Sequence, residues 1–235
     1  MADISGPAIP KALLRVGRRP FIDFKLASLA AEGVKRVVLL LGHGDRLIAN
    51  HVGTGSQYGL HVTCQSDGPI LLGTGGAVRR ALDLLGEAFW VTYGDTYLRA
   101  PMTEIEATFH GQDVEGMMTV LRNRDRWDRS NVRIEKDLVV EHRKGSRQGS
   151  YEYIDYGLAI LRREPVETFP AGAPFDLEHV FQRLIANGTM GAYVVARRFY
   201  EIGSPQGYRQ TKEFLRASGE WKRLVERRVS PGPAG

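Results

Sequence analysis

The sequence predicts a doubly wound α/β fold built on a mixed, mostly parallel sheet. Short apolar runs alternate with segments of helical periodicity along the first half of the chain, which is the pattern of consecutive βαβ units. The run Arg36–Leu41 is apolar after its first residue, as expected of a strand covered on both faces of a parallel sheet. A charged segment, residues 123–150, interrupts the alternation and predicts a small β-hairpin excursion.

The elements of the first half follow from their own residues. Ile22, Leu26 and Leu29 recur at helical spacing and predict a helix over residues 21–31, which Gly33 is suited to end. Strand and helix patterns then follow in turn. The other elements predicted here are strands over 36–41, 60–65, 88–93 and 116–121, and helices over 45–51, 76–85 and 102–110.

The second half resumes the alternation after the hairpin. Two strand patterns, 132–135 and 138–141, flank a turn at Lys136 and Asp137. Pro205 suits the start of the last helix because its φ is fixed. The other predicted elements are strands over 156–161 and 192–195 and helices over 176–187 and 205–217. We expect one domain over residues 1–235, with a disordered tail at 230–235.

Composition indicates a soluble globular protein and excludes several classes of function. Of the 235 residues, 43% are hydrophobic and 25% are charged, as in ordinary globular chains. No run approaches the roughly 20 apolar residues of a membrane span, and no signal peptide is recognisable, so we expect a cytoplasmic protein without a membrane partner. The net charge of +5 is modest and its arginines are dispersed, which favours a small anionic substrate over nucleic acid. Cys64, the single cysteine, is expected to be a half-buried strand residue.

The segment 71–96 carries the strongest indication of function. Gly73, Gly75 and Gly76 let the backbone approach a ligand closely, and they open a predicted helix whose first amides can point at an anion. Asp95 follows the strand 88–93, and ligands of open α/β sheets lie at such strand ends. A carboxylate there suits Mg²⁺. Together these features indicate a phosphate or nucleotide site.

Five segments, in order, give the chain a resemblance to a known family. They are PKALLRVGRRPFIDF, LLGTGGA, YGDT, YIDYGLAILRRE and FYEIGSPQGY, and they extend from Pro10 to about Leu215. In this order they resemble the sugar-1-phosphate nucleotidylyltransferases, the NDP-sugar pyrophosphorylases. The resemblance implies a Rossmann-like nucleotidyltransferase fold. It also implies a reaction in which a sugar 1-phosphate and a nucleoside triphosphate give an NDP-sugar and pyrophosphate.

The resemblance also implies roles for particular residues. Lys11 matches the family lysine that meets the triphosphate or the sugar phosphate, and Asp95 matches the Mg²⁺ aspartate. Glu201 falls where many members place a second metal aspartate, although its longer side chain moves the carboxylate outward by about one bond length. The residues that match the loop beside the base and sugar are Gly73, Thr74, Gly75 and Gly76.

On the sugar side, the resemblance is less complete. Lys144 in EHRKG matches the family lysine that grips the sugar phosphate, with Arg143 as the competing choice, because the usual EKP form is absent. Asp155 and Gly157 sit where members bind the sugar hydroxyls, and an aspartate is a good acceptor for such groups. Asp155 can equally be a strand-edge residue. The charged patch 125–129 either lines the sugar pocket or is solvated.

The N-terminus departs from the family pattern. Members carry an apolar strand and a GxGTR[LM] loop ahead of the PK pair, and residues 1–9 fit neither. We therefore expect an N-terminally truncated chain, either because the recorded start lies downstream of the true one or because the truncation is real. In-frame upstream codons for a strand and GxGTR would establish the first alternative. The chain as given is expected to leave a sheet position unpaired and to have little or no activity.

The expected function is Mg²⁺-dependent transfer of a nucleoside monophosphate from a nucleoside triphosphate to a sugar 1-phosphate. General resemblance favours guanylyl transfer to a mannose- or heptose-type 1-phosphate. Two alternatives stay open. A glycosyltransferase that consumes NDP-sugars should carry a DxD pair where this chain has YGDT. A non-catalytic nucleotide-sugar-binding relative would keep the pocket without the phosphate loop.

Overall fold

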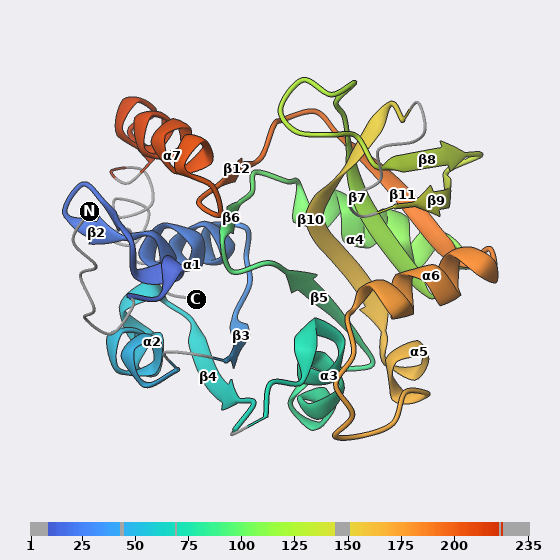
Figure 1. The fold of residues 1–235 in the computed structure, drawn as a ribbon, viewed down its shortest axis with the longest axis horizontal. Helices are drawn as coiled ribbons and strands as arrows, with labels where there is room; N and C mark the ends of the chain where they lie inside the picture. The colour runs from blue at the N-terminus through green and yellow to red at the C-terminus, as the bar shows by residue number, and fades with distance from the viewer. Residues whose placement is uncertain (1–8, 43–44, 69, 144–150, 221, 223–235) are drawn as a thin grey trace, which may run out of the picture. The chain divides into compact units, whose positions relative to one another are not determined.

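The chain folds into two compact units. The computed structural model describes residues 9–42, 45–68, 70–143, 151–220 and 222. The first unit comprises residues 1–68, 94–97 and 200–235, and the second comprises residues 69–93 and 98–199. Figure 1 labels most helices and strands of both units. The expectation of a single domain over 1–235 stays a prediction.

Within the described residues, the strands of the first unit form three two-stranded sheets. Strands β3 and β4 pair in parallel over their whole length, whereas β1 with β2 and β6 with β12 pair antiparallel. The bounds of its strands are β1 Arg15–Val16, β2 Arg19–Pro20, β3 Arg36–Leu41, β4 His61–Ser66, β6 Thr96–Tyr97 and β12 Tyr200–Glu201. Its helices are α1 Phe21–Ala31, α2 Asp45–Val52 and α7 Pro205–Ala217, with short 3-10 turns η1 Lys11–Leu13 and η2 Ser56–Tyr58.

Helix α1 is the centre of the first unit. Its residues are buried without a break from Phe21 to Ala27, as expected of a helix that is apolar on most sides. Ile22 and Leu26 pack in one core cluster with α2 and β4, while Phe24 packs in a second cluster with residues near α7. The half-buried Cys64 lies against the first cluster, in agreement with its expected role.

A six-stranded mixed sheet forms the second unit. The strand order is β5-β10-β7-β11-β9-β8, and β8 also pairs with β10. Its strands are β5 Ala88–Thr92, β7 Gly116–Arg122, β8 Val132–Glu135, β9 Leu138–His142, β10 Tyr153–Arg162 and β11 Met190–Val195. Its helices are α3 Gly73–Arg80, α4 Met102–Gly111, α5 Arg163–Glu167 and α6 Glu178–Ala186, with the 3-10 turn η3 Leu82–Leu84.

The expectation of a mostly parallel sheet is wrong for this unit. Among the described strands of this sheet, only β7 and β11 pair in parallel, whereas β10 is antiparallel to both β5 and β7. The sequence could not distinguish the two directions, because an apolar strand has the same side-chain periodicity in either one. The mixed α/β class that the sequence predicted is nevertheless present.

Strands β8 and β9 form an antiparallel hairpin with Lys136 and Asp137 at its turn. Both turn residues have positive φ, 49° and 63°, the conformation that tight hairpin turns require. The hairpin also joins the main sheet, because β9 pairs with β11 and β8 pairs with β10. The hairpin is therefore part of the main sheet rather than an excursion from it.

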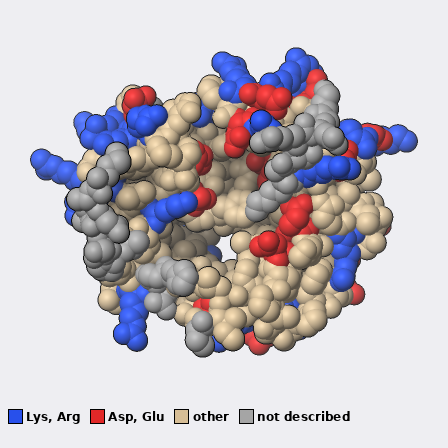
Figure 2. Space-filling view, in the orientation of Figure 1, with Lys and Arg blue, Asp and Glu red and all other residues tan. Residues whose placement is uncertain are grey.

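The distribution of surface charge and the lengths of the helices agree with what the composition predicted. On the face shown in Figure 2, Lys and Arg atoms form several separate groups among Asp and Glu atoms instead of one continuous basic surface. Among the helices of the described ranges, none has the length and apolar character needed to cross a bilayer.

Candidate functional site

Strands β6 and β12 bring Asp95 and Glu201 together in the first unit. Glu201 pairs with Thr96 across the two strands, and the Ile202 amide donates to the Asp95 carbonyl at 3.0 Å. Both carboxylates lie against Gly203. A Cβ atom built there would be 3.1 Å from Glu201 Oε2 and 3.2 Å from Asp95 Oδ2. Two carboxylates that are distant in sequence therefore converge on one point.

The start of helix α7 orients the Glu201 carboxylate. Its Oε2 accepts from the Ser204 amide at 2.9 Å, and its Oε1 accepts from the Ser204 hydroxyl at 2.6 Å. The Ser204 hydroxyl is also the N-cap of α7, because it accepts from the Gly207 amide at 2.9 Å. A Cβ at Gly207 would overlap the Glu201 carboxylate. Glycine at this position is thus a condition for the placement of Glu201.

Lys25 of α1 lies close to Asp95 and was missed by sequence reasoning. Its ammonium donates to the Thr96 carbonyl at 2.7 Å. Burial lowers the pKa of Lys25 to about 7, although the nearby charge of Asp95 favours the ammonium form. A lysine in the middle of the apolar segment FIDFKLASLA was the signal that could have found it, since buried lysines are rare without a partner.

The converging carboxylates fit the requirements of Mg²⁺. This ion is commonly held by one or two carboxylates, together with water and substrate phosphates. Within the part of the chain that the structure describes, no cluster of three or more His, Cys, Asp or Glu side chains could hold a metal alone. Glu201 accepts hydrogen bonds from Ser204, yet each carboxylate oxygen has two lone pairs and can accept a further partner.

Lys11 lies in the same unit as this pair. It is the first residue of the turn η1, and its side chain is exposed. The proline before it has an extended backbone, with φ −51° and ψ 136°. An exposed ammonium on a short turn suits contact with a phosphate.

The glycine segment belongs to the second unit and is more enclosed than expected. The three glycines form the first turn of α3 instead of a loop ahead of it. The amides of Gly75 and Gly76 both donate to the Phe175 carbonyl, at 2.9 and 3.1 Å. The Thr74 hydroxyl accepts from the Leu177 amide at 2.9 Å. These amides are therefore engaged within the protein, and the expectation that they point at an anion is wrong for Gly75 and Gly76.

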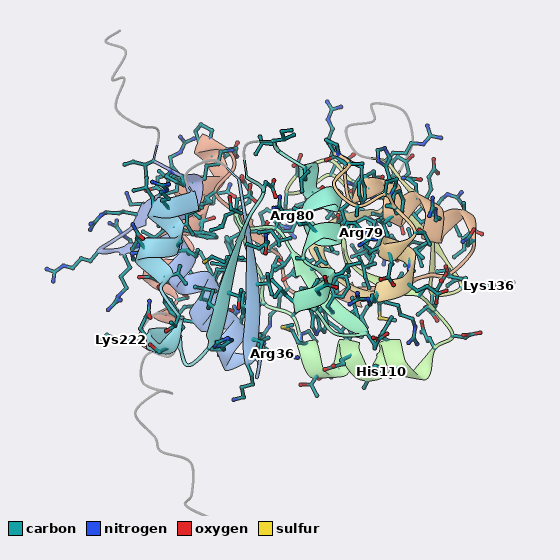
Figure 3. The ribbon with its side chains drawn as sticks, turned by 90° about the horizontal axis from the view of Figure 1, so that it is seen from below. Arg36, Arg79, Arg80, His110, Lys136 and Lys222 are labelled. Atoms are coloured by element: carbon teal, nitrogen blue, oxygen red, sulfur yellow. The ribbon has the colours of Figure 1, made fainter. Side chains whose placement is uncertain are left out.

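Close packing explains why small residues are needed there. A Cβ at Gly73 would lie 2.7 Å from the Phe175 carbonyl oxygen, and one at Gly76 would lie 2.7 Å from that of Ala173. Phe175 stacks on Phe169 with ring centroids 4.6 Å apart. Arg79, labelled on α3 in Figure 3, donates to the Phe169 carbonyl at 2.9 Å. The segment 169–177 is thus held firmly against α3.

Asp155 and Gly157 lie together on β10. Gly157 has φ +83°, and its amide donates to Asp155 Oδ1 at 2.8 Å. The pairing of β10 with β7 shifts register after Asp155, as expected of a β-bulge, which re-aims a side chain. The Asp155 side chain is 14% exposed, so it is largely buried.

The other residues that the sequence predicted to lie near the sugar differ in where the structure places them. Lys144 lies outside the described residues. Arg143 is exposed, and its Nε pairs with Glu141 Oε1 at 2.6 Å. Every residue of the patch 125–129 is exposed, in agreement with its solvated alternative, and the guanidinium groups of Arg126 and Arg198 lie over the Trp127 ring.

A family model described as nucleotidyl transferase matches residues 3–131. The chain is 24% identical to D-glycero-alpha-D-manno-heptose 1-phosphate guanylyltransferase of Campylobacter jejuni, over 85% of this chain and 88% of that relative. It is 25% identical to mannose-1-phosphate guanylyltransferase of Mycobacterium tuberculosis, over 96% of this chain and 61% of that longer relative.

The fold is also similar to that of solved structures. HddC from Yersinia pseudotuberculosis, complexed with GMP-PN, superposes with a TM-score of 0.77 at 24% identity. The match covers 91% of this chain and 93% of that one. This likeness supports the mixed α/β fold.

Proposed function

This chain belongs to the nucleotidyl transferase family, and we propose that it transfers a nucleoside monophosphate from a nucleoside triphosphate to a sugar 1-phosphate. The products are an NDP-sugar and pyrophosphate. The observation that carries the proposal is the convergence of Asp95 and Glu201 on Gly203, because nucleotidyl transfer depends on neutralising and aligning phosphates.

The chemistry assigned to the chain needs no covalent intermediate. An oxygen of the sugar phosphate forms a bond to the α-phosphorus in line, and the bond from that phosphorus to the bridging oxygen of the β-phosphate breaks. Mg²⁺, held by Asp95 and Glu201, would supply charge neutralisation at the phosphates. The exposed ammonium of Lys11 would contact a phosphate oxygen and lower the charge repulsion between the reactants.

We further propose that the second unit binds the sugar and the base. The Asp155 carboxylate, fixed by the Gly157 amide, is suited to accept hydrogen bonds from sugar hydroxyls. The backbone of Gly73, Thr74, Gly75 and Gly76 would lie close to the ligand. It would not direct the amides of Gly75 and Gly76 at an anion, because both donate to the Phe175 carbonyl.

The favoured reaction is guanylyl transfer to a mannose- or heptose-type 1-phosphate. The similarity to a heptose 1-phosphate and a mannose 1-phosphate guanylyltransferase supports this choice.

A product panel tests the proposal. Four nucleoside triphosphates are combined with mannose, heptose, glucose and N-acetylglucosamine 1-phosphates, with Mg²⁺, and NDP-sugar and pyrophosphate are measured. The polypeptide of residues 1–235 and a form extended at its N-terminus are both assayed, with Asp95→Asn as the inactive control. We expect GDP-mannose or GDP-heptose in at least one form. Nucleotide-sugar binding by both forms without any product would instead indicate the non-catalytic alternative.

A further inference from the structure

A buried lysine lies beside the short strand that follows Asp95. Among the described residues, Lys25 is the only lysine or arginine that is buried. Its neighbours in α1, Phe24 and Leu26, pack into two different core clusters, so the backbone of Lys25 is held from both sides. Burying an ammonium is costly unless it is paired and hydrogen-bonded. A lysine here therefore needs a reason that an apolar residue would not meet.

The partner of Lys25 is the strand β6. Lys25 Nζ donates to the Thr96 carbonyl at 2.7 Å, and the Asp95 carboxylate is close enough to act on the charge of the same ammonium. The Thr96 hydroxyl in turn donates to Asp95 Oδ1 at 3.3 Å. One residue, Thr96, thus connects the buried lysine to the Asp95 carboxylate.

Strand β6 needs an anchor because its own ladder is short. Both β6 and its partner β12 are two residues long, and an isolated two-stranded ladder is at best marginally stable in water. The Tyr97 side chain packs into the core cluster that contains Phe24, which fixes the end of β6. Lys25 fixes the preceding residue, Thr96, next to Asp95.

The two carboxylates of the candidate metal site have separate supports. Glu201 accepts from the amide and the hydroxyl of Ser204, at the start of α7. The support of Asp95 comes from Thr96 and, through it, from Lys25 in α1. Groups that orient metal ligands contribute to metal affinity without touching the metal. The affinity of the pair for a divalent cation should therefore depend on Lys25.

We propose that Lys25 is a positioning residue of the metal site, holding β6 on α1 so that Asp95 stays where it and Glu201 can bind one divalent cation. This inference rests on the proposed function, because it takes these two carboxylates as the metal ligands. It gives Lys25 no contact with the metal or the substrate. Lysine at this position then serves the metal site at a cost in stability.

Binding of Mn²⁺ separates this role from a merely structural one. Electron paramagnetic resonance of free Mn²⁺ measures the affinity at pH 7 in the wild type and in Lys25→Met, which keeps an apolar stem without the donor. We expect about tenfold weaker binding, as for the loss of other groups that orient metal ligands. Removing a positive charge would by itself strengthen the binding of a cation, so the change in charge cannot cause the expected weakening.

The melting temperature without metal is measured on the same samples. It should not fall in Lys25→Met, because replacing a buried charge by an apolar side chain is often neutral or stabilising. Lys35→Met is the matched control, since Lys35 is exposed, and it should change neither quantity. Lys25→Gln retains a donor and should recover part of the lost affinity; it also carries the test if Lys25→Met does not fold.

A double-mutant cycle tests whether Lys25 acts through Asp95. In the Asp95→Asn background, Lys25→Met should change Mn²⁺ affinity little, since coupled residues are not additive. Unchanged or tighter Mn²⁺ binding in Lys25→Met, the full weakening in the Asp95→Asn background, or a parallel fall in melting temperature would overturn the positioning role. So would a wild type that binds no Mn²⁺, even where it forms product. A wild type that binds Mn²⁺ but gives no product overturns the proposed function instead.

Discussion

Replacing Lys25 by methionine should change how the stability of the protein depends on pH. Burial holds the pKa of Lys25 at about 7 in the folded protein, whereas the unfolded chain keeps the ordinary value of 10.5. Between these values the unfolded state binds a proton that the folded state lacks, so the free energy of unfolding rises with pH. The cost of burying Lys25 is fully present below pH 7 and vanishes toward pH 10.5.

The size of the effect follows from the difference between the two pKa values. Since one pKa unit is worth about 1.4 kcal/mol, the change from 10.5 to about 7 corresponds to roughly 5 kcal/mol in total. Lys25→Met removes this cost and also removes the hydrogen bond to the Thr96 carbonyl, a loss of about 1–3 kcal/mol at every pH. The variant should therefore be more stable than the wild type at pH 7 and less stable near pH 10.

Urea denaturation at several pH values, followed by circular dichroism, measures this difference. The stability of the wild type minus that of Lys25→Met should rise by about 3 kcal/mol between pH 7 and pH 9.5. Lys35→Met is the matched control, because Lys35 is exposed and should give a flat difference. A flat difference for Lys25→Met would refute the reasoning that burial depresses its pKa.

Three other outcomes are expected. Gly75→Ala should lower the melting temperature and cost about 1–3 kcal/mol of stability, because its Cβ would meet the Phe175 ring. Gly111→Ala is the control, since nothing lies within 4 Å of a Cβ there. Equal melting temperatures for the two variants would contradict this. Asp95→Asn should weaken Mn²⁺ binding by more than about tenfold, as measured by calorimetry, because the loss of even a residue that supports a metal ligand weakens metal binding that much. Unchanged affinity would show that Asp95 is not a metal ligand. Cys64 should react with a thiol reagent at pH 8 more slowly than free cysteine, because burial raises its pKa, and rapid stoichiometric labelling would argue against its burial.

Much of the fold could be predicted because its elements have strong local patterns. The strand Arg36–Leu41 and the helix Phe21–Ala31 have the predicted bounds, since apolar periodicity specifies an element directly. The direction of β10 could not be predicted, because the strands with which it pairs, β5 and β7, lie far from it in the sequence. The family resemblance led to the hypothesis that Asp95 and Glu201 hold the same metal ion. The pairing of β6 with β12 brings the two residues close together.

The rest of the candidate site depends on contacts that no local pattern records. Gly75 looked available to a ligand, but the Phe175 carbonyl, about 100 residues away in the chain, accepts from its amide. Nothing in the local sequence marks His142 at the end of β9, and only the fold places it near Asp155 and Glu178. Buried polar groups of this kind become visible when tertiary structure supplies their partners.

An isotope experiment tests the central claim, nucleotidyl transfer, most directly. Mannose 1-phosphate carrying ¹⁸O in its phosphate is incubated with GTP, Mg²⁺ and the protein, and the masses of the separated products are measured by mass spectrometry. Attack of the sugar phosphate on the α-phosphorus places all of the ¹⁸O in the NDP-sugar and leaves pyrophosphate unlabelled. Labelled pyrophosphate, or an NDP-sugar without the label, would contradict the account.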